Sequence, residues 1–206
     1  MPRDATQTRA RLLREAERQF ARHGVYQATL RDITEAAGQR NVSALNYHFG
    51  SRDGIVVEIL RRHGDPLDVA RGALVDEPIE AMATAALVRA LLVPLSGELR
   101  RADGRDYLRI VAQLASRFPA WRMDDPLTPS NLQRILEVLE SRANSRDPAV
   151  RRDRVVNVIM LMMAAMAERA RLIDRRRSPE LDDDAFVANL TDMIVGALEA
   201  PSFREA

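Results

Sequence analysis

Apolar residues in this chain recur at helical spacing, and no stretch alternates polar and apolar positions as a half-buried β-strand does. Leu12, Ala16 and Phe20 form one such row at intervals of four residues. Aromatic residues make up only 4% of the chain and glycines number nine, whereas alanine, leucine, arginine and glutamate are abundant. These abundant residue types favour helices. The sequence therefore predicts an all-α protein.

The composition excludes several kinds of site. The 206 residues contain no cysteine, which rules out disulfides, thiolate metal sites and cysteine nucleophiles, and with three histidines a histidine-rich metal centre is not expected. No apolar stretch reaches the roughly 18 residues of a membrane helix. The N-terminal residues also lack the apolar segment of a signal peptide. We expect a cytoplasmic protein with no metal, no cofactor and no membrane partner.

The charges are distributed unevenly, although the net charge is only +1. Residues 1–62 contain 11 arginines and 7 acidic residues, whereas residues 63–206 contain 20 arginines and 23 acidic residues. A small basic N-terminal part thus precedes a larger, slightly acidic part. A basic surface is what binding to a phosphate backbone requires.

The N-terminal part has the helix order of a helix-turn-helix. A helix is expected from Thr8 to His23, then a second helix that Thr29 caps and Gly38 ends, and then a third helix of about two turns over 42–49. Two short helices joined by a tight turn that contains glycine make a helix-turn-helix, and its second helix enters the major groove of DNA. The alternative is an exposed polar turn without a ligand, but the order of capped helices favours the DNA-binding interpretation.

The residues around this turn suit DNA recognition. An arginine pairs with guanine and an asparagine with adenine, which makes Arg40, Asn41 and Asn46 candidates for reading bases. Residues at helix starts and flanks contact phosphates. The predicted DNA-binding residues are Thr29, Arg40, Asn41, Ser43, Asn46, Tyr47, His48 and Arg52.

The stretch from Thr8 to about Leu60 resembles the DNA-binding domain of TetR/AcrR-type repressors. The matching segments are Phe-Ala-Arg-His-Gly at 20–24, Ala-Thr-Leu-Arg-Asp-Ile at 28–33 and Leu-Asn-Tyr-His-Phe-Gly-Ser-Arg at 45–52. The turn is one residue longer than is usual in that family, and Asn46 replaces the first aromatic residue of the usual Tyr-Tyr-His-Phe. The resemblance implies that Tyr47 and Arg52 contact phosphates, and that His48 and Phe49 hold the third helix against the first.

The resemblance also implies the organisation of the whole chain. We expect a three-helix helix-turn-helix domain at 1–50, followed by a larger helical ligand-binding and dimerisation domain at 51–206. Proteins of this family dimerise through a four-helix bundle made from the last two long helices of each subunit.

Prolines are expected to mark the starts and breaks of helices. A fourth helix, capped by Ser51, is expected to run to about His63 and to connect the two domains, with Pro66 beyond its end. Pro94 lies inside an apolar helical pattern and is expected to kink or end that helix.

The C-terminal half contains two helices with long apolar rows. Residues 155–167 are apolar at every position except Asn157, within a helix predicted from about Pro148 to Arg175. A helix that is apolar all round is buried all round, which in a chain of this size implies a second copy as well as the chain's own core. The predicted dimerisation residues are Val155, Ile159, Met166, Phe186, Leu190, Ile194 and Leu198.

Other features of this half have two interpretations each. The methionines near residue 160 fill ordinary core or line a cavity, and Trp121 covers a cavity or packs in the core. The Asp182-Asp183-Asp184 run complements a helix dipole or binds a diphosphate. The predicted effector-binding residues are Tyr107, Arg109, Gln113, Phe118, Trp121, Met160 and Met163.

These observations favour a homodimeric transcriptional repressor that a small apolar or amphipathic effector releases from double-stranded operator DNA. The Asn-Tyr-His-Phe-Gly-Ser pattern resembles a subset of the family that includes fatty-acid-responsive regulators, so an acyl effector is one lead. An all-α enzyme and a helical adaptor that does not bind DNA are the alternatives. The sequence shows no nucleophile–base pair, metal-ligand spacing or phosphate-binding loop to support an enzyme.

Overall fold

A computed structural model describes residues 2–115 and 129–202, and for residues 2–4 it describes the backbone alone. This part of the chain consists of α-helices and one short 3₁₀ helix and contains no strand, which confirms the all-α prediction. The elements are α1 (Pro2–His23), α2 (Leu30–Ala36), α3 (Ser43–Phe49), α4 (Arg52–Gly72), η1 (Ile79–Ala81), α5 (Thr84–Glu98), α6 (Ala102–Leu114), α7 (Ser130–Arg142), α8 (Pro148–Asp174) and α9 (Asp183–Glu199).

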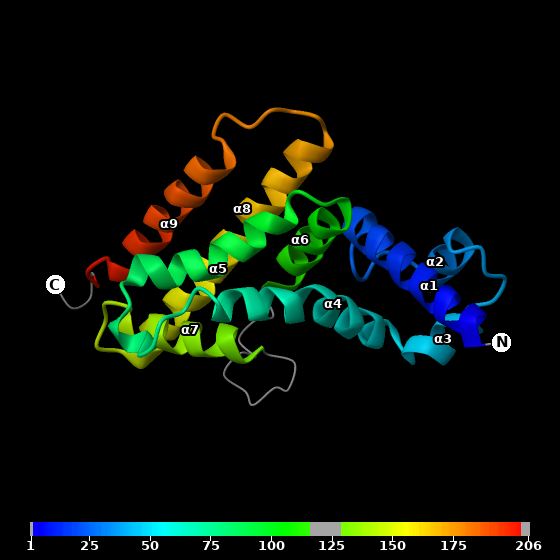
Figure 1. Ribbon diagram of the computed structural model, residues 1–206, viewed down its shortest axis with the longest axis horizontal. Helices are drawn as coiled ribbons and strands as arrows, with labels where there is room; N and C mark the ends of the chain where they lie inside the picture. The colour runs from blue at the N-terminus through cyan, green and yellow to red at the C-terminus, as the bar shows by residue number, and fades with distance from the viewer. Residues whose placement is uncertain (1, 116–128, 203–206) are drawn as a thin grey trace.

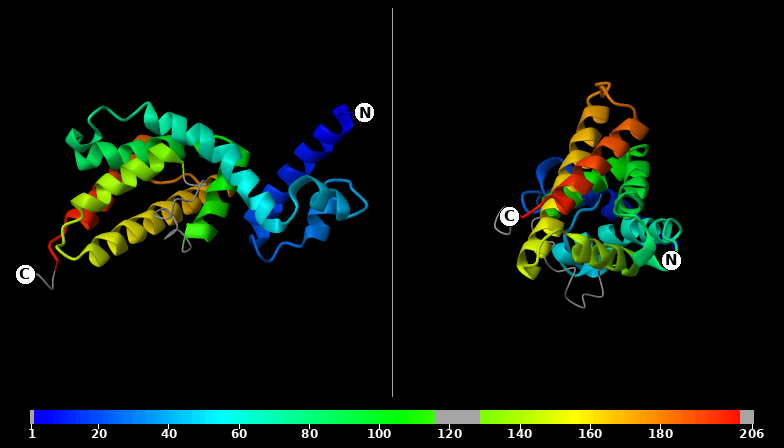
Figure 2. Two further views of the ribbon diagram at one scale, coloured as in Figure 1. Left: turned by 90° about the horizontal axis from the view of Figure 1, so that it is seen from below. Right: turned by 90° about the vertical axis from the view of Figure 1, so that its left-hand side faces the viewer.

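The molecule is elongated (Figure 1). Helices α1, α2 and α3 form a head at one end, and α5 to α9 form a body at the other. Helix α4 passes from the head into the body, as the left view of Figure 2 shows. In the body α6 packs against α8, and α5 packs against α9. No described helix is long and apolar enough to cross a membrane.

The caps predicted for the head are present. The side chain of Thr29 accepts a hydrogen bond from the amide of Asp32 at 3.1 Å, and that of Ser51 accepts one from the amide of Gly54 at 3.1 Å. These bonds satisfy amides that have no partner within their own helices. Gly38, which follows α2, has a φ of 70°, a conformation that glycine adopts without strain.

The head has a small core in which three helices meet. Leu12, Ala16 and Phe20 are fully buried, as their spacing along α1 predicts. Ile33 of α2 and Leu45 of α3 are buried in the same cluster. Leu45 is the only fully buried residue of α3, and Ala44 and Phe49 pack partly buried against the core, so much of the helix surface stays exposed.

Two prolines lie inside helices that continue through them, so Pro66 does not break α4 as expected and Pro94 does not end α5. Helix α4 runs past Pro66 to Gly72, and α5 runs past Pro94 to Glu98. A proline inside a helix removes one hydrogen bond and costs about 3 kcal/mol. The neighbouring residues Leu67 and Leu95 are buried against other helices, and such packing offsets that cost. The connector between head and body is therefore longer than predicted.

Candidate nucleic-acid interface

Helices α2 and α3 present polar and aromatic side chains to the outside of the head. Arg40 lies in the turn between the two helices, and Asn46 and Tyr47 lie on α3; all three are exposed. Tyr47 is 84% exposed, so its ring is accessible to a ligand. The arrangement therefore offers base-reading and stacking groups on one short helix.

Asn41 and Ser43 have a structural role in addition to their predicted one. The side-chain oxygen of Asn41 accepts hydrogen bonds from the Ser43 amide at 2.9 Å and from the Ser43 hydroxyl at 2.8 Å. These bonds fix the first turn of α3. Asn41 therefore holds the start of the predicted recognition helix and keeps its amide NH₂ group as a possible donor to DNA.

Arg52, predicted to contact a phosphate, makes contacts within the head. Its Nη1 donates to the carbonyl of Val25 at 2.6 Å, and its guanidinium lies 5.6 Å from the centre of the Phe20 ring. Arg52 therefore ties the start of α4 to the loop between α1 and α2. Thr29, the cap of α2, is exposed at the start of its helix, where a phosphate can approach.

The resemblance implies that His48 and Phe49 hold α3 against α1. Both side chains are half-buried, and Phe49 packs against the core. The guanidinium of Arg9 on α1 lies 5.1 Å from the centre of the Phe49 ring. The ring of His48 lies between those of Tyr47 and Phe49, at 5.0 and 6.2 Å. Phe49 thus links α3 to α1.

A buried polar cluster joins the head to the body, and no pattern in the sequence predicts it. His63 of α4 lies between two carboxylates: its Nε2 is 2.5 Å from Glu17 of α1, and its Nδ1 is 2.8 Å from Glu98 of α5. Arg62 also donates to Glu17 at 3.1 Å. The ring of Tyr107 from α6 stacks on the His63 ring at 4.6 Å. Four helices therefore meet at one histidine.

The cluster favours a protonated histidine. Burial of His63 disfavours its charged form, but the hydrogen bonds and charges of Glu17 and Glu98 outweigh this effect and raise the pKa of His63 to about 9. The cation then bridges a carboxylate of the head and a carboxylate of the body.

Gln113, predicted to bind an effector, instead bridges the body and the head. Its side-chain oxygen accepts a hydrogen bond from the amide of Val25 at 2.8 Å, and its Nε2 donates to the carbonyl of Phe20 at 3.1 Å. Arg109, one turn earlier on α6, is paired with Asp106 and with Asp174 of α8. Helical periodicity gives no indication of which neighbouring element such polar side chains meet.

The other predicted effector residues do not share one face. Tyr107 and Met163 are buried, whereas the side chain of Met160 is 40% exposed. Met162 and Met166 are also buried, as both the core and the cavity-lining interpretations require. Phe118 and Trp121 lie outside the described residues.

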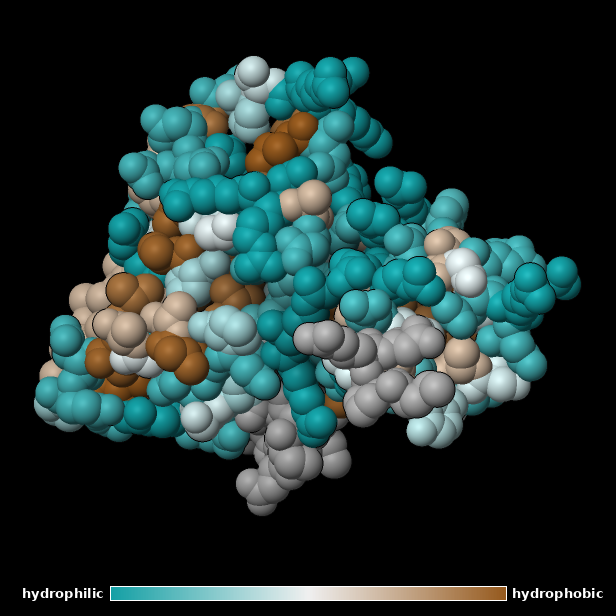
Figure 3. Space-filling view, turned by 45° about the vertical axis from the view of Figure 1, so that its right-hand side comes forward, coloured by the Kyte–Doolittle hydropathy of each residue, from teal (hydrophilic) through white to brown (hydrophobic). Residues whose placement is uncertain are grey.

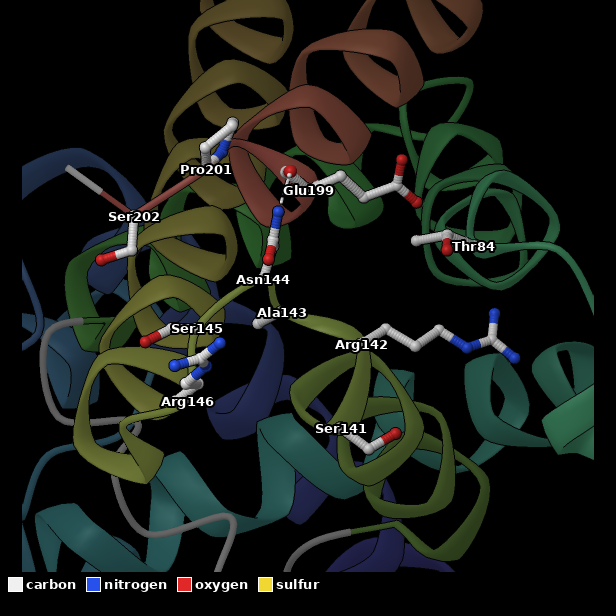
Figure 4. Close-up of a pocket in the computed structure, with 10 residues that line it drawn as sticks. All are labelled: Thr84, Ser141, Arg142, Ala143, Asn144, Ser145, Arg146, Glu199, Pro201 and Ser202. Atoms are coloured by element: carbon white, nitrogen blue, oxygen red, sulfur yellow. Dashed lines mark hydrogen bonds between the residues drawn. The ribbon is translucent and has the colours of Figure 1, made fainter. Parts of the chain in front are cut away.

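A surface pocket of about 710 Å³ lies at the far end of the body, between the α7–α8 loop and the end of α9 (Figure 4). Its lining is largely polar, and Asn144 donates to the carbonyl of Glu199 across it at 3.0 Å. None of the predicted effector residues lines this pocket. In the part of the chain that the structure describes, no group of three or more acidic or histidine side chains could hold a metal ion.

The predicted dimerisation residues mostly serve the core of the single chain. Six of them are buried without a second copy, and Phe186 is half-buried with the Arg169 guanidinium 4.4 Å from its ring centre. The six are Val155, Ile159, Met166, Leu190, Ile194 and Leu198. Since α9 packs on α5, the apolar row of α9 is covered from within, and these side chains are not available at the surface to a partner.

The exposed apolar residues of α8 and α9 are different ones. The side chain of Met193 is 49% exposed, and Ala164 and Ala197 are exposed as well, together with Met160. In the view of Figure 3 the hydrophobic residues are more frequent on the body, whereas the head is mostly hydrophilic.

The aspartates at the start of α9 have structural partners. Asp182 caps the helix by accepting from the amide of Ala185 at 2.8 Å, and Asp183 pairs with Arg169 at 2.6 Å. These contacts support the interpretation of the run as a helix start.

Comparisons with known proteins agree with the fold. Residues 12–59 match the model of the bacterial regulatory proteins of the tetR family. No curated protein matches the chain. A TetR-like transcriptional regulator from Rhodococcus sp. RHA1 is 15% identical, with a TM-score of 0.58, over 94% of this chain and 96% of that one. The fatty acid degradation regulator FadR from Bacillus halodurans is 14% identical, with a TM-score of 0.51, over 93% of this chain and 96% of that one.

Proposed function

We propose that this chain, whose residues 12–59 match the model of the bacterial regulatory proteins of the tetR family, is a DNA-binding regulator that acts as a homodimeric repressor. In this proposal the head binds double-stranded operator DNA, and a small apolar or amphipathic effector bound in the body releases it. The fold supports a regulator over the all-α enzyme and the adaptor. The proposed division places DNA binding in residues 1–50, and effector binding and dimerisation in residues 51–206.

The observation that carries the DNA-binding proposal is the exposed surface of α3. Leu45 and Phe49 anchor this helix, while Asn46 and Tyr47 are exposed, as is Arg40 in the preceding turn. A recognition helix in the major groove needs such exposed donors near its N-terminus. We assign base reading to Arg40 and Asn46, and phosphate contacts to Thr29 and Tyr47.

Replacing Arg40 or Asn46 by alanine is expected to weaken operator binding by about 1–3 kcal/mol and to relax the preference at one base pair. The operator is first obtained by selection from a pool of random-sequence duplexes, and affinity is then measured by fluorescence anisotropy. Arg177→Ala, at an exposed position of the body, is the control and should bind as the unchanged protein does. Normal affinity and normal base preference in both head variants would refute the assignment.

Dimerisation is proposed to use the outward face of α8 and α9. This face carries Met160 and Met193, which are exposed in the single chain and would be covered by a second copy. Small exposed residues such as Ala164 and Ala197 let the helices of two copies approach closely.

Met193→Glu is therefore expected to convert dimers to monomers, because it places an unpaired charge in the covered face. Sedimentation velocity measures the change, and the melting temperature of the monomer should show that it is folded. Val69→Glu is the matched control, since Val69 is 74% exposed on α4 and lies outside this face. Ile194→Glu should instead unfold the protomer, because Ile194 is buried within it. A Met193→Glu variant that stays a dimer would contradict the proposed interface.

A further inference from the structure

The interior of the body contains an arginine that lacks a full set of partners. Arg71, in the last turn of α4, has a side chain that is only 6% exposed. Its Nε has no hydrogen-bond partner among the described residues. The carboxylate paired with it is that of Asp68, whose Oδ1 lies 3.8 Å from Nη1, beyond hydrogen-bond distance.

Asp68 is already engaged by α7. Its carboxylate accepts hydrogen bonds from the amides of Asn131 at 3.1 Å and Leu132 at 2.8 Å, and from the side chain of Asn131 at 3.2 Å. These bonds cap the first turn of α7, where a negative charge complements the helix dipole. The carboxylate is thus held away from Arg71, which remains a buried cation with donors to spare.

Arg169, by contrast, is a buried arginine whose guanidinium has hydrogen-bond acceptors. Its side chain is also 6% exposed, but its guanidinium donates to Asp183 at 2.6 Å and to the carbonyl of Leu181 at 3.0 Å. A buried charge without such bonds is costly, and buried groups of this kind cluster at functional sites. The difference between the two arginines therefore points to a ligand for Arg71.

Tyr107 supplies a second donor in the same interior. Its phenol is buried and interacts electrostatically with Arg71. Burial raises the pKa of Tyr107 to about 12, so the hydroxyl keeps its proton and can donate a hydrogen bond. A guanidinium with a neutral phenol beside it is a donor set that suits a carboxylate.

We propose that Arg71, together with Tyr107, binds the carboxylate of an amphipathic effector inside the body. This inference rests on the proposed function and specifies its effector as an amphipathic carboxylic acid. The helices on which α4 packs, α5, α6 and α7, carry buried apolar side chains, which is the kind of surrounding that an apolar tail requires.

The site is connected to the head by the contacts described above. Tyr107 stacks on His63, and His63 is hydrogen-bonded to Glu17 of α1. A carboxylate at Arg71 adds a negative charge next to this cluster. The ligand shifts the equilibrium between two positions of the head only to the extent that its affinity for the two conformations differs.

The test compares matched ligands on matched variants of the full chain. The ligands are butyrate, decanoate and palmitate, each with its corresponding alcohol, titrated calorimetrically into the unchanged protein and into Arg71→Met and Arg71→Lys. At least one carboxylate should bind roughly tenfold tighter than its alcohol, Arg71→Met should abolish the difference, and Arg71→Lys should retain part of it. Binding of that carboxylate should also weaken binding to the selected operator.

Melting temperatures without ligand separate a ligand site from a structural ion pair. Arg71→Met should leave the melting temperature unchanged or raise it, whereas Arg169→Met should lower it. The proposal is overturned if no carboxylate binds, if Arg71→Met binds as the unchanged protein does, or if Arg71→Met is destabilised as much as Arg169→Met. Failure to obtain any operator would count against the proposed function, whereas an operator that binds without a carboxylate effect would count against this site.

Discussion

Replacing His63 by leucine is expected to lower the free energy of unfolding by roughly 3–5 kcal/mol. The substitution leaves the carboxylates of Glu17 and Glu98 facing each other without the cation that lies between them. Removing one partner of a buried charge cluster costs more than the cluster contributed, because the remaining charges stay desolvated. Urea denaturation followed by circular dichroism measures the loss.

Two further variants show whether the loss comes from the cluster. Arg31→Ala breaks an exposed pair with Glu35, 2.8 Å apart on α2, and should change stability by less than about 1 kcal/mol. Adding Glu17→Leu to His63→Leu should restore part of the loss, since it removes one stranded carboxylate. A His63→Leu protein as stable as Arg31→Ala would show that the buried contacts do not hold the head to the body.

Stability should also fall with rising pH in a window set by His63. The pKa of this histidine is about 9 in the folded chain, above its ordinary value of 6.5. The contribution is therefore fully present below about pH 6.5 and is lost as the pH rises through 9, with a total of about 3 kcal/mol. The groups that face the imidazole are Glu17 from α1, Glu98 from α5 and Tyr107 from α6, with Arg62 on α4 and Asp103 nearby.

Denaturation curves across this window test the dependence. The His63→Leu variant is the control, because it retains every other titrating group and should lose little stability between about pH 6.5 and 9. Tyr107 titrates at about 12, above the window, so its own loss of a proton does not contribute. A free energy of unfolding that does not change with pH in the protein without substitutions would contradict the assignment of a protonated His63.

The helices and their caps could be predicted because their causes are local. Thr29 and Ser51 satisfy amides three residues away, so the local sequence contains both partners of each bond. Pro66 was misleading for the opposite reason: its local preference to end α4 is overridden by packing against helices distant in the sequence.

The spacing of an apolar row did not predict which element of the structure covers it. Leu190 and Ile194 have the pattern of an interface, but α5 of the same chain covers them. Periodicity identifies which face of a helix is buried and does not identify the element that buries it. Gln113 illustrates the same point for a polar residue, because its partners Phe20 and Val25 lie 93 and 88 positions away.

The continuity of α4 through Pro66 has a mechanical consequence. At 1.5 Å per residue, its 21 residues form a lever arm about 30 Å long, with its far end in the body and its near end at the head. A tilt of about 10° at the body end would carry the head through roughly 5 Å. In a symmetric dimer the two heads would move in opposite directions, and their separation would change by about 10 Å. That is close to a third of the roughly 34 Å helical repeat of DNA, enough to put the spacing of the two recognition helices out of step with successive major grooves.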